Sequence, residues 1–140
     1  SYSIVYQEDP ILKTYLAQLK FVTDQGFSPW IENCLICHDL IQTEIFHFYL
    51  NKGGILCDKP SCRKHGVDSS IVLLHQANIS AIFYLINLPY EKCFNIKIEL
   101  ELRDEFILFS KRYVNTVMEK EYKKLDMLTT MEKFEKGIYE

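Results

Sequence analysis

Four cysteines in two short-range pairs are the residues of this sequence whose type and spacing most clearly indicate chemistry. Cys34 and Cys37 bracket "LI", Cys57 and Cys62 bracket "DKPS", and nineteen residues separate the pairs. Two thiolates that leave one tight turn can bind a single ion at about 2.3 Å. The layout is typical of a four-cysteine zinc site, except that the second pair is separated by four residues instead of two. The sequence therefore predicts one zinc ion, held by these four cysteines.

The second cysteine pair leaves alternatives open. A wide turn at 58–60 would let Cys62 complete the site, and His65 is the other candidate for the fourth ligand. A disulfide, an iron–sulfur cluster or ordinary buried thiols are further interpretations of such cysteines. The total of five cysteines is odd and the sequence shows no signal-peptide pattern, which argues against a disulfide framework.

A zinc ion with four sulfur ligands has a structural role, because no coordination position is left for water. His38, His47 and His65 lie near the cysteines and are interpreted as surface residues or as hydrogen-bond partners of the ligands. Cys93 is expected to be a half-buried thiol and not a nucleophile. The sequence offers no catalytic triad, phosphate-binding glycine loop or recognisable carboxylate pair. We therefore expect no catalytic residues and a protein that is not an enzyme.

Length and composition predict one soluble domain. The chain has 140 residues, 48% of them hydrophobic, and no apolar run of about 18 residues. Residues 1–140 are expected to form a single helical domain, with residues 34–65 inserted as a zinc knuckle. The formal net charge of −3 gives no overall basic surface, so any nucleic-acid binding has to be local.

The elements that hold the cysteines are predicted from hydrophobic period and capping residues. Asp9 and Pro10 begin a helix that ends at Gly26, because an acidic cap and a proline at the first helical position favour a helix start. "TEIFHFYL" and "ILC" form a hairpin around "NKGG", followed by a polar loop "RKHGVDSS". The state of "IVLLHQ" is not determined by its period.

Three helices complete the predicted fold. Asn78 is expected to cap a helix that ends before Pro89, and a loop "PYEKCFN" follows. A long helix over about 99–124 is then predicted, with a final short helix capped by Asp126. The apolar stripe of the long helix comprises Leu102, Phe106, Phe109, Tyr113, Val117 and Tyr122. The fold class is mainly α, a helical bundle-like domain with an inserted four-cysteine zinc knuckle and a small β-hairpin.

Basic residues give weaker candidates for DNA or partner binding. On the long helix these are Arg103, Lys111, Arg112, Lys120, Lys123 and Lys124. Lysines at a helix carboxy end also offset the macrodipole and solvate the surface, which is the simpler interpretation. Around the cysteines they are Lys52, Lys59, Arg63, Lys64 and His65, with Phe46, Phe48 and Tyr49 able to stack on bases. Alternating aromatic residues on a small hairpin more often form its core face.

The segments "YLAQLKFVTDQGFSPWIENC", "CLIC" and "GGILC" together resemble the carboxy-terminal region of the bacterial recombination mediator RecO. The residues that carry the resemblance are Leu16, Leu19, Gly26, Pro29, Cys34, Cys37, Gly53, Gly54 and Cys57. The resemblance runs from about Pro10 to Leu128, and after Gly66 it is confined to helix length and pattern. The four-residue gap before Cys62 departs from the family pattern, which leaves the fourth ligand open between Cys62 and His65.

The resemblance implies a non-enzymatic protein of recombinational DNA repair. Such a mediator helps to load RecA onto single-stranded DNA, through contacts with the tail of the single-stranded DNA-binding protein, with RecR and with DNA. The family's amino-terminal OB-fold does not fit into the nine residues before the first helix, so the chain is expected to be the helical and zinc part alone, with weak DNA affinity. A bacterial cytoplasmic, nucleoid-associated location is implied as well. A zinc-stapled nucleic-acid-binding or protein-interaction module of unrelated function is the alternative.

Overall fold

The computed structural model of the protein describes residues 9–136. In chain order its elements are helix α2 (Pro10–Asp24), strands β1 (Ile45–Tyr49) and β2 (Gly54–Ile55), helix α3 (Pro60–Arg63), 3-10 helix η1 (Lys64–Gly66), strand β3 (Ile71–His75), helix α4 (Gln76–Asn87), 3-10 helices η2 (Tyr90–Asn95) and η3 (Leu100–Leu102), and helix α5 (Arg103–Lys136). The predicted mainly α fold with a small β element and a four-cysteine cluster is confirmed.

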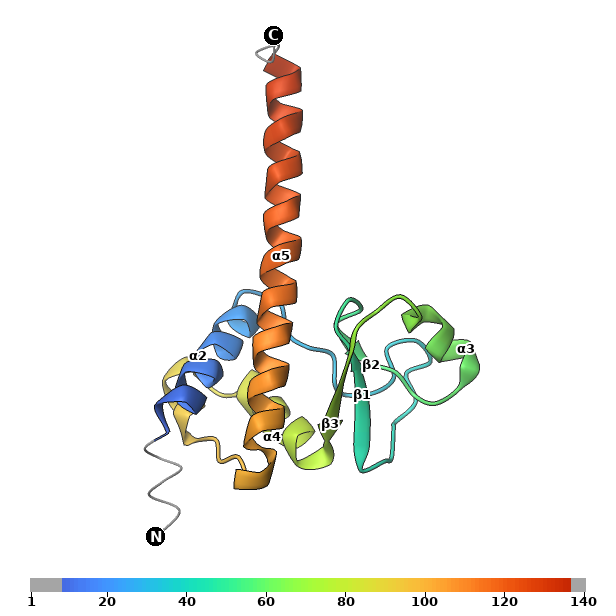
Figure 1. The fold of residues 1–140 in the computed structure, drawn as a ribbon, viewed down its shortest axis with the longest axis vertical. Coiled ribbons are helices and arrows are strands. Elements are labelled where there is room, and N and C mark those ends of the chain that lie inside the picture. Colours follow the sequence, from blue (N-terminus) through green and yellow to red (C-terminus); the bar gives the residue numbers. More distant parts are fainter. Residues whose placement is uncertain (1–8, 137–140) are drawn as a thin grey trace.

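Helix α5 is the central element of the fold and lies between α2 and the sheet (Figure 1). Its first half packs against α2 on one side and against the small sheet on the other, and α4 lies between β3 and α2; its second half extends beyond the rest of the fold. The short helix α3 lies at the far side of the sheet from α2. Within residues 9–136, no helix is both long and apolar enough to cross a membrane.

Helix α2 begins and ends as its sequence predicts. The Asp9 carboxylate accepts the Leu12 N–H at 3.1 Å, Pro10 occupies the first turn, and Gly26 follows the helix with a φ of 98°. Asp9 also contacts Arg103 at the start of α5, whose Nη2 donates to Asp9 Oδ1 at 3.1 Å. One side chain therefore caps α2 and joins it to α5.

This double role predicts a pH-dependent contribution to stability. Hydrogen bonds from the Arg103 guanidinium lower the pKa of Asp9, against the opposing effect of burial, and the Leu12 N–H lowers it further. A lowered carboxyl pKa stabilises the fold above the unfolded value of about 3.9, and this contribution is lost as the pH falls through the lower, folded pKa. We expect Asp9→Asn, which keeps a capping side chain, to reduce the free energy of unfolding at pH 6 by about 1 kcal/mol, near the upper limit for an ion pair close to the surface.

Thermal melts across pH 2 to 7 check this expectation by giving the wild-type minus Asp9→Asn difference in stability. The difference should be largest above pH ~5 and should disappear below the folded pKa of Asp9. Asp104→Asn is the matched control, because Asp104 contacts the same arginine at 3.2 Å but its side chain is 96% exposed. An equal loss in both variants, or a difference that grows at low pH, would contradict the assignment.

The sheet has the order β2-β1-β3 and both strand pairs are antiparallel. The predicted hairpin is confirmed as β1 and β2, with Phe48 opposite Ile55. The secondary structure of the segment that forms β3 could not be predicted from its hydrophobic period, because this segment is apolar on both faces. Val72 and Leu74 are buried, whereas Ile71 and Leu73 are 41% and 50% exposed, so the alternation appears only in the burial. The predicted polar loop after Cys62 is partly helical, as the end of α3 and η1.

The predicted role of Asn78 as a helix cap is wrong. Helix α4 begins at Gln76, and Asn78 is a buried residue of its first turn, with Nδ2 donating to Glu105 Oε2 at 2.6 Å and to the Leu102 oxygen at 3.2 Å. Glu105 also accepts the His75 N–H at 2.9 Å. A carboxylate from α5 therefore satisfies the amino end of α4, which no local pattern could show. The predicted end of α4 before Pro89 is confirmed.

We expect the Glu105 carboxylate to contribute measurably to stability. It accepts hydrogen bonds from a backbone N–H and from a buried amide, and its side chain is 18% exposed. Glu105→Ala removes Oε2, the oxygen that accepts both hydrogen bonds, and should lower the free energy of unfolding by about 1 to 3 kcal/mol. Urea denaturation measures the change, with Glu101→Ala, at an exposed site, as the control. Identical midpoints for the two variants would show that water replaces this carboxylate at no cost.

Helix α5 differs from the prediction at both ends. It begins at Arg103, after η3, and it continues through Asp126 to Lys136, so the predicted short helix capped by Asp126 is wrong. No proline or glycine interrupts residues 103–136, and without a breaker the potential cap remains inside the helix. The buried stripe ends at Val117, and Tyr122 is 70% exposed.

The main core joins α5 to the sheet. The Phe48 ring contacts Phe109 edge-to-face at 4.8 Å between centroids and Tyr113 at 5.6 Å, and the Tyr113 hydroxyl donates to the Phe27 oxygen at 2.8 Å. Cys93, predicted to be half-buried, is fully buried in this core, because η2 turns its side chain inward. Burial raises the pKa of the Cys93 thiol, so it is a protonated core residue.

Candidate metal centre

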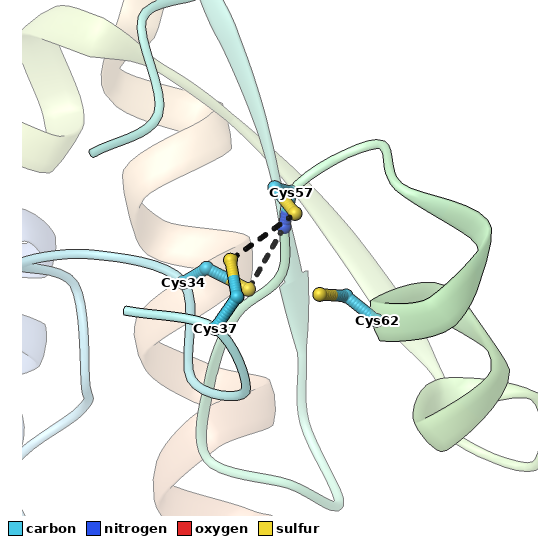
Figure 2. Close-up of side chains that lie close together, drawn as sticks. All are labelled: Cys34, Cys37, Cys57 and Cys62. Carbon is cyan, nitrogen blue, oxygen red and sulfur yellow. Dashed lines mark hydrogen bonds between the residues drawn. The ribbon is translucent and has the colours of Figure 1, made fainter. Parts of the chain in front are cut away.

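Three separate chain segments bring the four cysteines together (Figure 2). Cys34 and Cys37 come from the loop before β1, Cys57 follows β2, and Cys62 points from α3 toward the other three. All four sulfurs lie within 4.8 Å of one another, and Cys34, Cys57 and Cys62 are buried. Sulfurs at the corners of a tetrahedron, each about 2.3 Å from an ion, are about 3.8 Å apart. The Cys37 and Cys57 sulfurs are 3.8 Å apart, so the spacing suits a tetrahedral metal site.

Backbone hydrogen bonds fix the first pair of cysteines. The His38 N–H donates to the Cys34 oxygen at 2.9 Å and closes the turn, and His38 itself has a φ of 65°. This left-handed conformation reverses the chain directly after Cys37 and is unfavourable for most residues that carry a Cβ. The Leu35 N–H donates to the Ile55 oxygen at 3.0 Å, which holds the turn against β2. The two halves of the cluster are thus joined by backbone contacts.

The electrostatics of the cluster favour a cation. Burial opposes ionisation of Cys34, but N–H groups of residues 36, 37 and 57 point at its sulfur and lower its pKa to about 6. Burial and the neighbouring sulfurs raise the pKa of Cys57, and that of Cys62 to about 12. One thiolate therefore discourages ionisation of its neighbours. A divalent cation at the centre would remove this repulsion and let all four sulfurs act as thiolates.

An ion pair that the sequence did not reveal closes the outer side of the cluster. Lys59 contacts Asp39, and its Nζ lies 3.7 Å from the Cys37 sulfur. The Lys59 hydrogen bond lowers the pKa of Asp39, and the Asp39 carboxylate raises the pKa of Lys59. Lys59, a candidate for phosphate contact, is therefore paired within the protein. The useful signal was its position between Cys57 and Cys62, where a cation can compensate thiolate charge.

The histidines near the cluster are distributed around it. His65 is exposed in η1 and does not belong to the group of potential metal ligands within residues 9–136, which contains Cys62. The His38 ring contacts Trp30 edge-to-face at 6.5 Å between centroids. His47 is half-buried on β1, and burial, followed by the charge of Arg63, lowers its pKa. That Cys62 is a ligand stays a prediction, and the geometry favours it over His65.

A small second core supports the cysteines. Tyr49 and Leu56 are buried with Cys34, Cys57 and Cys62, so the cluster packs on the outer face of the sheet. Gly66 is required here, because a Cβ at this position would lie 2.3 Å from the Tyr49 ring. Phe46, Phe48 and Tyr49 are all buried, and their rings are not available for stacking on bases. The simpler interpretation of the hairpin aromatics therefore holds.

The basic candidates fall into different environments. Arg63 Nε donates to the Cys57 oxygen at 3.1 Å, and Arg103 is paired with Asp9 and Asp104. These two arginines thus have structural partners. Lys52, Lys64, Lys111 and Lys124 are exposed. Arg112, Lys120 and Lys123 line one cleft.

Comparison with known proteins reveals similarity to DNA repair protein RecO. The RecO of Acetivibrio thermocellus is 23% identical over 124 residues, which are 89% of this chain and 47% of that protein. The RecO of Thermoanaerobacter sp. strain X514 is 26% identical over 126 residues, or 90% and 48% of the two chains. The chain is RecO-like over most of its length. A RecO of Dehalococcoides mccartyi is 23% identical over 114 residues.

The RecO relatives are longer than the RecO-like chain, which spans about half the length of those it matches. No protein-family profile and no solved structure matches the chain. The resemblance seen in the sequence is thus confirmed by similarity over 81–90% of the chain.

Proposed function

We propose that this chain is a domain of a recombination mediator in DNA repair. The observation that supports the proposal is the similarity to RecO proteins over 81–90% of the chain. The four-cysteine cluster fits this role as a structural zinc site, in which Cys34, Cys37, Cys57 and Cys62 would hold the ion. With four sulfur ligands, the zinc would fold the knuckle and would activate no water.

The domain would act through binding and not through chemistry of its own. Its proposed partners are the acidic tail of the single-stranded DNA-binding protein, RecR and, weakly, single-stranded DNA, and its effect would be to help load RecA. The three basic residues of one cleft, Arg112, Lys120 and Lys123, suit an anionic partner. The burial of the hairpin aromatics argues against strong DNA binding by the knuckle, since base stacking provides much of single-strand affinity.

RecA loading tests the proposal directly. Single-stranded DNA coated with its binding protein is incubated with RecA and RecR, and ATP hydrolysis by RecA reports filament formation. We expect the purified protein to shorten the lag. In parallel, calorimetry should show binding of the binding protein's tail peptide. No change in lag, together with no heat at millimolar peptide, would remove support for the mediator role.

The alternative is a nucleic-acid module centred on the knuckle, where Lys64 is exposed and Arg63 is half-buried. Fluorescence anisotropy with a labelled single strand distinguishes the two functions. Steeply salt-dependent binding that is lost in the charge-reversal variant Arg63→Glu and Lys64→Glu would favour this alternative.

A further inference from the structure

Strand β3 is an edge strand with hydrogen-bonding groups directed away from the sheet. It pairs with β1 on one side, and within residues 9–136 no strand pairs with its other side. The Leu50 N–H donates to the Ser70 oxygen at 2.9 Å, so the even-numbered residues bond to β1. Because the backbone direction alternates along an antiparallel strand, the N–H and C=O groups of Ile71 and Leu73 face outward.

One face of α5 lies beside this open edge. Near its amino end Glu105 accepts the His75 N–H at 2.9 Å, and further along the helix Arg112 lines a cleft together with Ser70. Glu105, Leu108 and Arg112 are spaced three and four residues apart, so they share one face of the helix. This face of α5 therefore follows the edge from the His75 end to the Ser70 end, with Leu108 in between.

The side chains along the edge are apolar and exposed. Ile71 and Leu73 are 41% and 50% exposed, Ile45 on the neighbouring strand is 41% exposed, and Leu108 is 49% exposed. An open strand edge with apolar side chains is a template on which another strand can pair. The surface thus suits a partner that offers both an extended strand and apolar side chains.

The charges of α5 are arranged symmetrically about Leu108. Asp104 and Glu105 precede it by four and three residues, and Lys111 and Arg112 follow it by three and four. If two copies of the helix run antiparallel about Leu108, Asp104 of each copy comes opposite Arg112 of the other, and Glu105 comes opposite Lys111. The Asp104 side chain is 96% exposed and Lys111 is exposed as well. The surface is therefore complementary in charge to a second copy of itself.

Strand β3 has the same symmetry. In an antiparallel pair of β3 strands centred on Val72, Ile71 of each copy lies opposite Leu73 of the other, and the two residues exchange their outward N–H···O=C bonds. Val72 lies between the two ends of β3, as Leu108 lies between Glu105 and Arg112 on α5. One two-fold axis can therefore pair both the strand edge and the charges.

We infer that two copies of this chain associate through β3, antiparallel about a two-fold axis near Val72 and Leu108, so that one continuous sheet crosses the dimer. A contact of this kind uses the same surface on both copies. Lys120 and Lys123 follow Arg112 by about two and three helical turns, so the rest of their cleft lies beyond the paired region. The inference rests on the strand edge and the charges of α5, and not on the DNA-repair role.

Analytical ultracentrifugation of the full chain tests the inference. The protein is measured from about 1 μM to about 1 mM, because a small interface gives a weak dimer. We expect monomers at the low end, dimers at the high end and no larger species, since a two-fold contact closes on itself.

Amide hydrogen exchange locates the interface. At the dimer concentration the amides of Ile71 and Leu73 should exchange at least about tenfold more slowly than in the monomer, because they gain hydrogen bonds. The amides of Val72 and Leu74, which already bond to β1, provide the internal reference and should change less.

Charge-reversal variants test the symmetry. Asp104→Arg and Arg112→Asp should each weaken dimerisation at least about tenfold, because each brings like charges opposite one another at both symmetry-related positions. An equimolar mixture of the two variants should restore dimerisation, since both positions of the heterodimer regain opposite charges. Damage to the fold could not be repaired by mixing. Lys124→Asp, at an exposed position on another face of α5, is the control and should dimerise like the wild type.

Three results would overturn the inference. The first is a wild-type protein that stays monomeric at about 1 mM. The second is a mixture of Asp104→Arg and Arg112→Asp that associates no better than either variant alone. The third is protection of Ile71 and Leu73 that does not depend on protein concentration, which would show that another segment of the same chain covers the edge. None of these results bears on the RecA-loading test.

Discussion

Removal of the metal will unfold the cysteine-bearing segments 34–40 and 57–66, while α2, α4, α5 and β1, which packs on α5 through Phe48, remain folded. Few hydrogen bonds besides those of the Leu35 and Cys57 N–H groups join the two cysteine pairs, so the free energy of metal binding is largely the folding free energy of these two segments. For structural zinc this amounts to about 10 to 16 kcal/mol at pH 7 in small peptides. The main core, built from α2, α4, the first half of α5 and the inner face of the sheet, contains none of the four cysteines.

Elemental analysis of the zinc content and amide hydrogen exchange test this expectation. The purified protein should contain one zinc per chain, and EDTA treatment should release it and accelerate exchange across 34–40 and 57–66, with amides of α2, α4 and β1 much less affected. Cys62→Ser should lose the metal or bind it far more weakly. His65→Gln is the matched control, because His65 is the competing ligand from the sequence and should retain full metal content. Loss of the metal in His65→Gln but not in Cys62→Ser would make His65 the fourth ligand. Unchanged exchange after chelation would mean that the bound metal does not stabilise this part of the fold.

Phe48→Ala will lower the free energy of unfolding more than the substitutions at Asp9 and Glu105. Phe48 is fully buried at the centre strand of the sheet, where it contacts Phe109 and Tyr113. Its truncation removes the aromatic contacts of β1 with α5 and leaves a cavity, which costs about 3 to 5 kcal/mol for a buried phenylalanine. A loss of this size is a large part of the stability of a single domain.

Urea denaturation followed by circular dichroism provides the measurement. Phe21→Ala is the control, since Phe21 is 55% exposed on α2 and its truncation should change the free energy of unfolding by about 0.5 kcal/mol or less. The metal content of Phe48→Ala should also be measured, because β1 carries Tyr49 of the second core. A loss of stability no larger than that of Phe21→Ala would mean that α5 and the sheet are not joined through this ring.

Local signals in the sequence were enough to predict the start of α2, the hairpin and the grouping of the four cysteines. Each depends on residues close together in the chain: Asp9 and Pro10 fix a helix start through their own backbone geometry, and Gly53 allows the tight turn of the hairpin with its φ of 75°. The cysteine pairs are recognisable because a tetrahedral ion imposes the spacing of its ligands. Such signals can be read without knowing the rest of the fold.

Only the tertiary structure decided features that depend on contacts between distant residues. Glu105, from α5, replaces the expected Asn78 cap of α4, and β3 is a strand because β1 provides its partner groups. Asp126 does not start a new helix, because no proline or glycine interrupts α5 around this residue and the helix continues to Lys136. The cleft lined by Arg112, Lys120 and Lys123 likewise exists only where α5 passes the turn after β1 and the start of β3. Capping, strand pairing and charge clustering across the fold are long-range properties, which is why the proximity of the cysteines could be predicted and this cleft could not.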